Sequence, residues 1–325
     1  MVTPTVISTF CGTGGSSLGY KWAGYKELLA VDFDKHAIEC FKLNFPDVPI
    51  WHKSIIDITG QEILKFCNLK RGELDVLDGS PPCQGFSTAG KRKVGDERND
   101  LFREYVRIIH DLSPKIFVME NVTGMVKGTM KGRFIEIMET LKGLDYNVKC
   151  KQMNSMYYGV PQSRERLIFI GVRKDLNMVP IYPTPSKHIT SVKEAWLNMP
   201  KQNTPELSNF LKNVVPKMKI GQNLNDIAGK GGFQVIRIYP NKPCPTIIKL
   251  IGGIGYASLI HPYENRVLSI DEIKRVCSFP DDWILTGRYA LQKARLGNAV
   301  MPKFMQAISE TLKTEILEKH YAGQG

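Results

Sequence analysis

The first 185 residues alternate between short apolar runs and amphipathic stretches, and this alternation restricts the possible folds more than any other feature. Runs such as Val6–Phe10, Leu28–Phe33 and Ile116–Glu120 are typical of strands that are covered on both faces, because such strands are apolar throughout. Between them, Leu101–Leu112 has apolar residues at helical spacing. Further strands are predicted at Leu74–Leu77, Val148–Lys151 and Leu167–Val172. Strands alternating with helices predict a doubly wound, mostly parallel sheet of the α/β class.

The pattern changes beyond about Pro183, where Pro-rich and Gly-rich stretches such as Pro240–Pro245 replace the periodicity. Helical patterning resumes at Asp271 and again at Pro302–Leu317, so we expect the last part of the chain to pack back on the first domain. The sequence therefore predicts two domains. Residues 1–185 together with 276–325 form the larger one, and residues 186–275 form a smaller, loop-rich one.

Composition and charge restrict the class of protein. Hydrophobic residues make up 42% and charged residues 23% of the chain, which is typical of a soluble folded protein and not of a disordered one. No apolar run approaches the roughly 18 residues of a membrane span, and the N-terminus lacks a signal-peptide layout. We therefore expect a cytoplasmic protein without membrane contact.

The formal net charge of +12 favours polyanionic partners. Between Ser186 and Asn265, ten Lys or Arg residues stand against four Asp or Glu residues, although a solvated surface is the alternative interpretation. The seven cysteines are scattered without a Cys-x-x-Cys pair, which argues against a disulfide framework and a structural zinc site. No bound metal is expected.

A glycine-rich turn follows the first predicted strand. In Phe10-Cys11-Gly12-Thr13-Gly14-Gly15 the glycines let the backbone turn tightly and approach a ligand. Ser17 stands where the dinucleotide fingerprint needs its third glycine, so diphosphate binding is not supported. Asp32 ends the next strand, where a carboxylate can accept hydrogen bonds from a ribose, and Phe33 can cover an adenine. This favours an adenosyl ligand; a turn without ligand, a helix-capping Asp32 and a core Phe33 are the alternatives.

Chemically capable side chains gather at one predicted edge of the sheet. Asp78–Ser87 follows a buried strand and puts Cys83 at the carboxyl edge, where doubly wound folds bind ligands. Glu120 ends another strand, where a carboxyl group is costly without a role or a partner. Arg164 and Arg166 alternate on an extended segment and point to one face. The alternatives are an inert buried thiol and a solvated strand edge with a surface ion pair.

These segments resemble, in order, the sequence blocks of the C5 cytosine methyltransferase family. The matching blocks are Phe10–Gly15, Asp32, Pro81-Pro82-Cys83-Gln84, Glu120-Asn121-Val122, Gln162-x-Arg164-x-Arg166 and Gly297-Asn298-Ala299-Val300-x-Pro302. A further block that supports the variable domain is matched by Arg266-x-Leu268-Ser269, Arg275 and Phe279-Pro280. The resemblance implies the fold of S-adenosylmethionine-dependent methyltransferases, with residues 186–275 as the target recognition domain.

The resemblance also implies a reaction: a methyl group passes from S-adenosyl-L-methionine to C5 of a cytosine flipped out of a specific duplex DNA sequence. Cys83 matches the nucleophile that attacks C6, Glu120 matches the residue that engages N3 and the exocyclic amine, and Arg166 matches the residue that binds O2. Arg164 supports the site and the DNA backbone, and Asn121 fixes the loop. Donation to N3 requires that Glu120 carry a proton. No side chain identifies itself as the base that removes the C5 proton.

The resemblance extends to ligand-binding residues. The implied cofactor-binding residues are Phe10, Gly12, Thr13, Gly14, Gly15, Asp32, Phe33, Ser54, Ile55, Pro82, Leu101, Asn298 and Val300. DNA contacts are expected from Gln84, Ser87, Lys91, Arg98, Arg237 and Thr246. The basic, glycine-punctuated segment Gly85–Asn99 matches the loop that closes over the flipped base, with a disordered surface loop as the alternative. The expected partner is double-stranded DNA, and the protein is expected to be a monomer. A cognate restriction endonuclease can belong to the same system, but no physical complex with it is expected.

The sequence departs from the family pattern at two places. Ser54 stands where the family usually has an Asp that contacts the adenine amine, and Asp57 could take over this contact. Val276-Cys277 replaces the more usual Leu-Gln, which is expected to affect packing only.

The residues agree less well with three other functions. An amino-group methyltransferase carries an aromatic residue where Cys83 stands, so Cys83 with Glu120 argues against it. A tRNA cytosine methyltransferase shares the chemistry, but the basic segment favours duplex DNA, since single-stranded RNA recognition depends on exposed aromatic residues. A silent DNA-binding relative is disfavoured by the complete set of Cys83, Glu120 and the two arginines.

Overall fold

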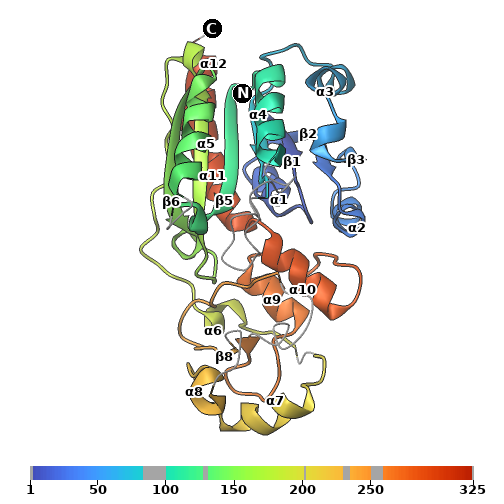
Figure 1. The fold of residues 1–325 in the computed structure, drawn as a ribbon, viewed down its shortest axis with the longest axis vertical. Coiled ribbons are helices and arrows are strands. Elements are labelled where there is room, and N and C mark those ends of the chain that lie inside the picture. The colour runs from blue at the N-terminus through green and yellow to red at the C-terminus, as the bar shows by residue number, and fades with distance from the viewer. Residues whose placement is uncertain are drawn as a thin grey trace. The chain divides into compact units, whose positions relative to one another are not determined.

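The computed structural model describes residues 3–82, 100–126, 131–200, 203–229, 235–249 and 259–323. The chain divides into two compact units (Figure 1). The first comprises Met1–Asn154, Glu165–Thr184 and Phe304–Gly325, and the second comprises Ser155–Arg164 and Pro185–Lys303. The second unit includes residues 276–303, which the sequence assigned to the larger domain. The functional boundaries of the two domains stay a prediction.

A seven-stranded sheet forms the centre of the first unit, in the order β3-β2-β1-β4-β5-β7-β6. Its strands are β1 (Thr5–Thr9), β2 (Lys26–Asp32), β3 (Ile50–His52), β4 (Val76–Gly79), β5 (Ile116–Val122), β6 (Tyr146–Asn154) and β7 (Glu165–Arg173). β1 to β5 pair in parallel, whereas β7 runs antiparallel to both of its neighbours. The predicted mostly parallel, doubly wound sheet is confirmed. The strand order reverses between β1 and β4. Because doubly wound folds bind ligands at the carboxyl ends of the strands where the order reverses, we expect a ligand site at this point.

β3 is the strand of this sheet that the sequence did not predict. It has three residues, Ile50–His52, which are too few for a periodic pattern to stand out. Pairing with β2 defines it, because Ala30, Val31 and Asp32 lie opposite its three residues. Tertiary pairing therefore decides the outer edge of the sheet.

Helices cover both faces of the sheet, and local signals explain several of their ends. Those of the first unit are α1 (Gly15–Trp22), α2 (Lys35–Asn44), α3 (Gly60–Cys67), α4 (Asp100–Leu112), α5 (Lys131–Gly143), α11 (Pro302–Leu312) and α12 (Glu318–Ala322). Short 3-10 turns lie at Ile55–Asp57, Thr123–Val126 and Lys174–Leu176, and a π-helical turn at Lys313–Leu317. Thr59 and Glu62 form a capping box that starts α3.

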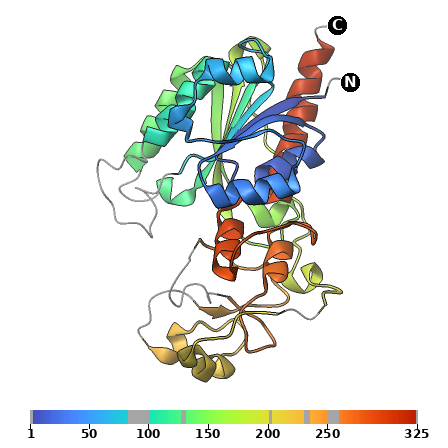
Figure 2. The same ribbon diagram turned by 90° about the vertical axis from the view of Figure 1, so that its right-hand side faces the viewer.

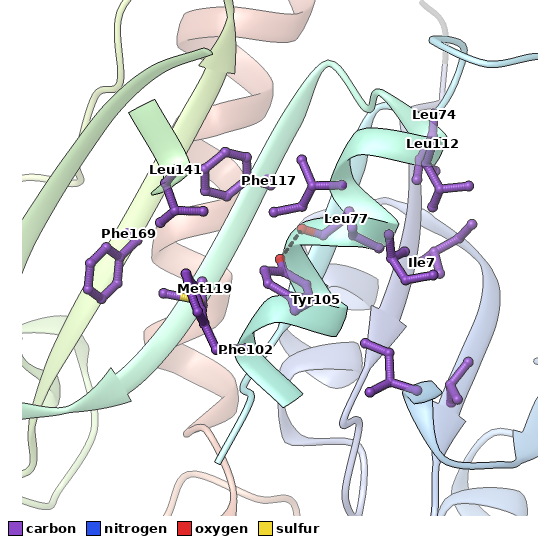
Figure 3. Close-up of a cluster of buried hydrophobic side chains, with 14 of the residues drawn as sticks. Ile7, Leu74, Leu77, Phe102, Tyr105, Leu112, Phe117, Met119, Leu141 and Phe169 are labelled. Atoms are coloured by element: carbon purple, nitrogen blue, oxygen red, sulfur yellow. Dashed lines mark hydrogen bonds between the residues drawn. The ribbon is translucent and has the colours of Figure 1, made fainter. Parts of the chain in front are cut away.

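The main hydrophobic core lies between one face of the sheet and helices α3, α4 and α5. Figure 3 shows part of this cluster, with Ile7, Leu77 and Phe117 from the strands and Tyr105 from α4. The Tyr105 hydroxyl is buried and donates toward the carbonyl oxygens of Leu77 (3.1 Å) and Val118 (2.8 Å). These bonds hold α4 against β4 and β5, the two strands that lead to the candidate catalytic residues.

The opposite face of the sheet is covered in part by the C-terminal helices, as Figure 2 shows for α11. The residues of α11 from Phe304 onward belong to the first unit. Tyr25, between α1 and β2, donates from its hydroxyl to the carbonyl of Ser309 at 2.9 Å. Lys313 donates to the carbonyl of Ala23 at 3.1 Å. The predicted return of the chain end to the first domain is thus observed from Phe304 onward.

The second unit has little regular structure. Its elements are a 3-10 turn at Ser155–Tyr158, α6 (Val192–Ala195), α7 (Asn209–Val214), a 3-10 turn at Val215–Lys217, α8 (Asn225–Ala228), β8 (Ile236–Arg237), β9 (Leu259–Ile260), α9 (Ile270–Val276) and α10 (Tyr289–Asn298). A small core that includes Leu211, Val215 and Ile260 holds them together. Ser269 and Glu272 form a capping box that starts α9. The loop-rich character agrees with the shift in composition beyond Pro183.

Candidate active site

The turn between β1 and α1 provides an open backbone surface. Gly12 has a φ of +56°, and a Cβ atom added there would meet no atom within 4 Å, so the backbone faces free space. Gly14 precedes the first residue of α1, Gly15, and Thr13 is buried beside them. Phe10 is partly buried and packs against the main core. The predicted tight turn is present, and its open side can accommodate part of a ligand.

Asp32 lies next to this turn, at the end of β2. Its carboxylate accepts hydrogen bonds from the backbone N–H of Gly12 (2.7 Å) and of Asp34 (2.8 Å). Burial raises the pKa of Asp32, while these two bonds act in the opposite direction. The N-cap of α2 is Asp34, whose side chain accepts from the N–H groups of His36 and Ala37. The structure therefore assigns the capping role to Asp34 and leaves Asp32 beside the glycine turn.

Two further predicted cofactor residues follow β2 and β3. Phe33 is 65% exposed, so it is not a core residue. Ser54 is partly buried, and its side chain accepts a hydrogen bond from the backbone of Ile56 at 3.4 Å. Ile55 is buried, whereas Asp57 is exposed. Asp32, Phe33 and Ser54 therefore line the ends of two neighbouring parallel strands.

Glu120 and Arg166 form an ion pair at the opposite side of the reversal point. Glu120 lies on β5 and Arg166 on β7, and Nε of Arg166 is 2.6 Å from Oε1 of Glu120. Both side chains are largely buried, with 12% and 15% of their surfaces exposed. A buried carboxylate is stabilised by such a partner, and the planar guanidinium restricts the direction of the carboxyl group.

Asn121 connects the end of β5 with the segment after β4. Its side-chain amide donates to the carbonyl of Pro81 at 3.1 Å, and its side-chain oxygen accepts from the N–H of Val122 at 2.8 Å. Pro81 is buried and Pro82 is partly buried. This contact holds the chain in place directly before Cys83.

Several predicted site residues lie outside the described residues: Cys83, Gln84, Ser87, Lys91 and Arg98, together with the Gly85–Asn99 segment. Leu101, a predicted cofactor residue on α4, is partly buried and packs against the main core. The described residues thus carry the two sides of the predicted site, with Glu120, Asn121 and Arg166 on one side and the glycine turn with Asp32 on the other.

Arg164 belongs to the second unit and is buried there. Its Nη1 donates to the carbonyl oxygens of Gly297 (2.9 Å) and Ile247 (3.2 Å). The hydroxyl of Thr246, a predicted DNA contact, donates to the carbonyl of Ser163 at 2.7 Å. These bonds support the backbone around the 244–248 segment.

Asn298 and Val300, two further predicted cofactor residues, also belong to the second unit, beside Gly297. Asn298 is the last residue of α10 and is exposed, whereas Val300 is buried.

Arg237, another predicted DNA contact, is buried in the second unit. Its guanidinium donates to the carbonyl oxygens of Val215 (2.7 Å), His261 (2.9 Å) and Glu264 (3.0 Å) and to the side chain of Asn265 (2.7 Å). In this position Arg237 holds a loop together. Direct DNA contact by Arg237 stays a prediction.

Two buried carboxyl groups close to the glycine turn were not singled out from the sequence. Burial raises the pKa of Asp78 to about 8 and that of Glu27 to about 7. The Tyr20 hydroxyl lies 3.4 Å from Asp78, and the Ser17 hydroxyl donates to Glu27 at 2.9 Å. The signal was present at Asp78, since an acidic residue directly follows the apolar Val76-Leu77 of a buried strand.

Neither a metal site nor a membrane span emerges from the described ranges. Within them, no group of three or more His, Cys, Asp or Glu side chains could hold a metal ion. None of the helices there has the length and apolar character that a membrane crossing requires.

Comparison with known proteins decides the family. The sequence profile described as C-5 cytosine-specific DNA methylase matches residues 4–314. The chain belongs to this family. The resemblance found in the sequence blocks is therefore confirmed over nearly the whole chain.

Individual relatives of this methylase are type II methyltransferases. M1.HphI of Haemophilus parahaemolyticus is 35% identical over 330 residues, covering 95% of this chain and 86% of that protein. M.DdeI of Desulfomicrobium norvegicum is 32% identical, covering 94% and 88% of the two chains.

Solved structures support the fold of the methylase. A protein encoded within an E. coli prophage superposes with a TM-score of 0.81 at 24% identity, covering 97% of this chain and 100% of that one. The S. pombe Dnmt2 methyltransferase superposes with a TM-score of 0.68 at 15% identity, covering 97% and 99%.

Proposed function

We propose that this methylase transfers a methyl group from S-adenosyl-L-methionine to C5 of a flipped-out cytosine in a specific duplex DNA sequence, through a covalent bond between Cys83 and C6. The observation that carries the proposal is the 2.6 Å pair of Glu120 and Arg166 on strands β5 and β7, beside the Pro81-Pro82 segment that leads to Cys83. Family membership supports cytosine C5 as the methylated atom.

The glycine turn and Asp32 fit an adenosyl ligand. Gly12 exposes its backbone to free space, and the Asp32 carboxylate beside it can accept hydrogen bonds from ribose hydroxyls. Phe33, which is 65% exposed, can lie against the adenine face. Bound S-adenosylmethionine supplies an electrophilic methyl group on its sulfonium. We also assign Asn298 and Val300 to this site, on the strength of the sequence block that contains them.

On the chemical side, the Cys83 thiolate adds to C6, which makes C5 nucleophilic enough to take the methyl group. A free thiol has a pKa of about 8.5, so the attack requires a setting that favours the thiolate. Glu120 faces N3 and the exocyclic amine and stabilises the charge that develops on attack. Arg166 binds O2 and fixes the direction of the Glu120 carboxyl group. Loss of the C5 proton to a base then expels Cys83 and restores the double bond.

Asn121 acts through the backbone. Its bond to the Pro81 carbonyl holds the segment before Cys83, so that the thiol approaches C6 from a fixed direction. Arg164 holds the backbone at Ile247 and Gly297 and thereby supports the site.

Duplex DNA is the proposed substrate because the basic segment between Ser186 and Asn265 favours a polyanionic duplex. Since C6 of a stacked cytosine is out of reach of a thiolate, the target base has to be flipped out, at a cost of a few kcal/mol. Residues 186–275 are proposed to read the target, with Thr246 placed near the backbone of the DNA. The type II names of the relatives support a role in DNA modification alongside a restriction endonuclease. We propose that the protein acts as a monomer in the cytoplasm, on the nucleoid.

The first test replaces the nucleophile. Cys83→Ser is expected to lower methyl transfer by at least about a thousandfold, because an alkoxide does not form at neutral pH, while DNA binding survives. Bisulfite sequencing of duplex DNA from cells expressing each variant measures methylation and identifies the target site, and a gel-shift assay measures binding.

Cys67→Ser and Cys150→Ser are matched controls, since both thiols are partly buried and lie on α3 and β6. Both should retain activity within a few-fold of the unmodified protein. Near-normal methylation by Cys83→Ser excludes the covalent mechanism. Methylation of tRNA but not of DNA in parallel bisulfite reactions excludes the DNA substrate.

A further inference from the structure

Ser54 follows the strand next to the one that ends in Asp32. In the parallel pair of β2 and β3, Asp32 lies opposite His52, and the N–H of Lys53 donates to the carbonyl of Asp32 at 3.1 Å. Going outward from β1, the strand ends carry the glycine turn, then Asp32, then Ser54. An adenosyl ligand that places its ribose at Asp32, as the proposed function requires, therefore directs its base toward Phe33 and Ser54.

The Ser54 hydroxyl keeps both kinds of hydrogen-bonding capacity. Among the residues that the structure describes, it accepts one bond, from the N–H of Ile56 at 3.4 Å. A serine hydroxyl has one donor hydrogen and two acceptor lone pairs, so after this bond one donor and one acceptor remain. The side chain is partly buried, and its bond from the Ile56 N–H restricts the directions in which the hydroxyl points.

A carboxylate in the same place behaves differently. An ionised Asp only accepts hydrogen bonds, so it pairs with the 6-amino group of adenine and repels the 6-oxo group of hypoxanthine. A hydroxyl accepts from the first group and donates to the second. Asp57 is exposed, and its backbone N–H donates to the Ser54 carbonyl at 3.0 Å. Its carboxylate belongs to the last residue of the turn that Ser54 starts, and does not occupy the position of the Ser54 side chain.

We infer that Ser54 is the specificity-determining residue for the base of the cofactor, and that it makes the site tolerant of both 6-amino and 6-oxo purines. The inference rests on the proposed binding of S-adenosylmethionine. Beyond that function, the inference states that the Ser54 hydroxyl, a neutral group that can donate or accept, recognises the purine edge. An Asp carboxylate at this position could only accept.

Calorimetric titration of the full-length protein with S-adenosyl-L-homocysteine and with S-inosyl-L-homocysteine tests the inference. The two dissociation constants of the unmodified protein should differ by less than about tenfold, which corresponds to about 1.4 kcal/mol. Ser54→Asp should raise the difference to about a hundredfold or more, because its carboxylate faces a second acceptor in the 6-oxo ligand. Ser54→Ala should weaken both ligands by a similar few-fold factor.

Asp57→Asn is the matched control and should leave the ratio unchanged. The inference is overturned if the unmodified protein already prefers the adenosyl ligand more than about a hundredfold, or if Asp57→Asn removes such a preference. Failure of the proposed function looks different: neither ligand then binds the unmodified protein. A thermal melt of each variant shows that the fold is retained.

Discussion

At the scale of single residues, the buried carboxyl groups of Asp78 and Glu27 lie beside α1, the helix that follows the glycine turn. Both lie in the first unit, on β4 and β2, and hydroxyl groups of Tyr20 and Ser17 lie within hydrogen-bonding distance of them. Burial raises both pKa values, so the folded state holds protons that the unfolded state releases. Stability at this site therefore depends on pH.

Asp78→Asn is expected to stabilise the protein at high pH. The folded pKa of Asp78 is raised to about 8, well above the unfolded value of about 3.9. The stability that the protonated group provides is complete below pH of about 4 and is lost as the pH rises through about 8. Asn keeps a neutral hydrogen-bonding group at every pH. The melting temperature of the Asp78→Asn variant should therefore exceed that of the unmodified protein at pH 8.5 by a few degrees.

The gain should shrink as the pH falls and vanish only below about pH 4, where Asp78 is protonated in both the folded and the unfolded state. Circular dichroism melts between pH 4 and pH 8.5 measure it. Asp47→Asn, at an exposed position, is the control and should show no pH-dependent difference. An Asp78→Asn variant that melts below the unmodified protein at pH 8.5 contradicts the assignment.

At the scale of elements, the 161–164 segment is paired with residues 244–248 along the backbone of the second unit. Ser163 donates to the carbonyl of Cys244 at 2.8 Å, and Cys244 donates to the carbonyl of Pro161 at 2.9 Å. Arg164 adds bonds to Ile247 and Gly297, so the end of α10 joins the same junction. This junction carries Thr246, a proposed DNA contact, and precedes Asn298, a proposed cofactor residue.

Gly297→Ala is expected to disrupt this junction. A Cβ atom there would lie 2.8 Å from the carbonyl carbon of Ile248, and a backbone atom cannot move aside as a side chain can. The strain should destabilise the protein by about 1–3 kcal/mol. Urea unfolding measures the change, and S-adenosylhomocysteine affinity is expected to fall with it.

Gly143→Ala is the matched control, because a Cβ atom at the end of α5 would meet nothing within 4 Å. It should be neutral or slightly stabilising, as expected for Ala in a helix. Equal stability of the two variants argues against a close approach at Gly297.

At the scale of the whole molecule, the net charge of +12 concerns DNA association more than folding. The surplus of basic residues between Ser186 and Asn265 amounts to six, from ten basic and four acidic residues. One of these basic residues, Arg237, has a structural role, because it is buried and donates to backbone carbonyls. The remaining lysines are candidates for phosphate contacts.

DNA affinity is accordingly expected to fall steeply with salt. Six phosphate contacts predict a slope of about −5 for the logarithm of the binding constant against the logarithm of salt concentration. Fluorescence anisotropy with a labelled duplex measures the slope, and S-adenosylhomocysteine binding serves as the salt-insensitive control. A slope near zero contradicts a phosphate-contacting basic surface.

Short-range patterns predicted much of the protein. Apolar runs located six of the seven strands of the large sheet, and helical spacing located α4 and α9, because both signals arise from neighbours along the chain. Local sequence also located the block that contains Glu120 and the block that contains Arg166. Both lie on strands in the structure, and antiparallel pairing of β5 with β7 brings the two side chains together.

By itself, the sequence determined the α/β class, the family and the residues that can carry the chemistry, since these depend on local patterns and on side-chain type. Tertiary structure decided what each residue contacts: Asp34 caps α2 while Asp32 faces the glycine turn, Arg237 turns inward, and β3 exists as a partner of β2. The physical reason is that burial and hydrogen-bond partners are set by register and packing between segments far apart in the chain, which no local pattern encodes.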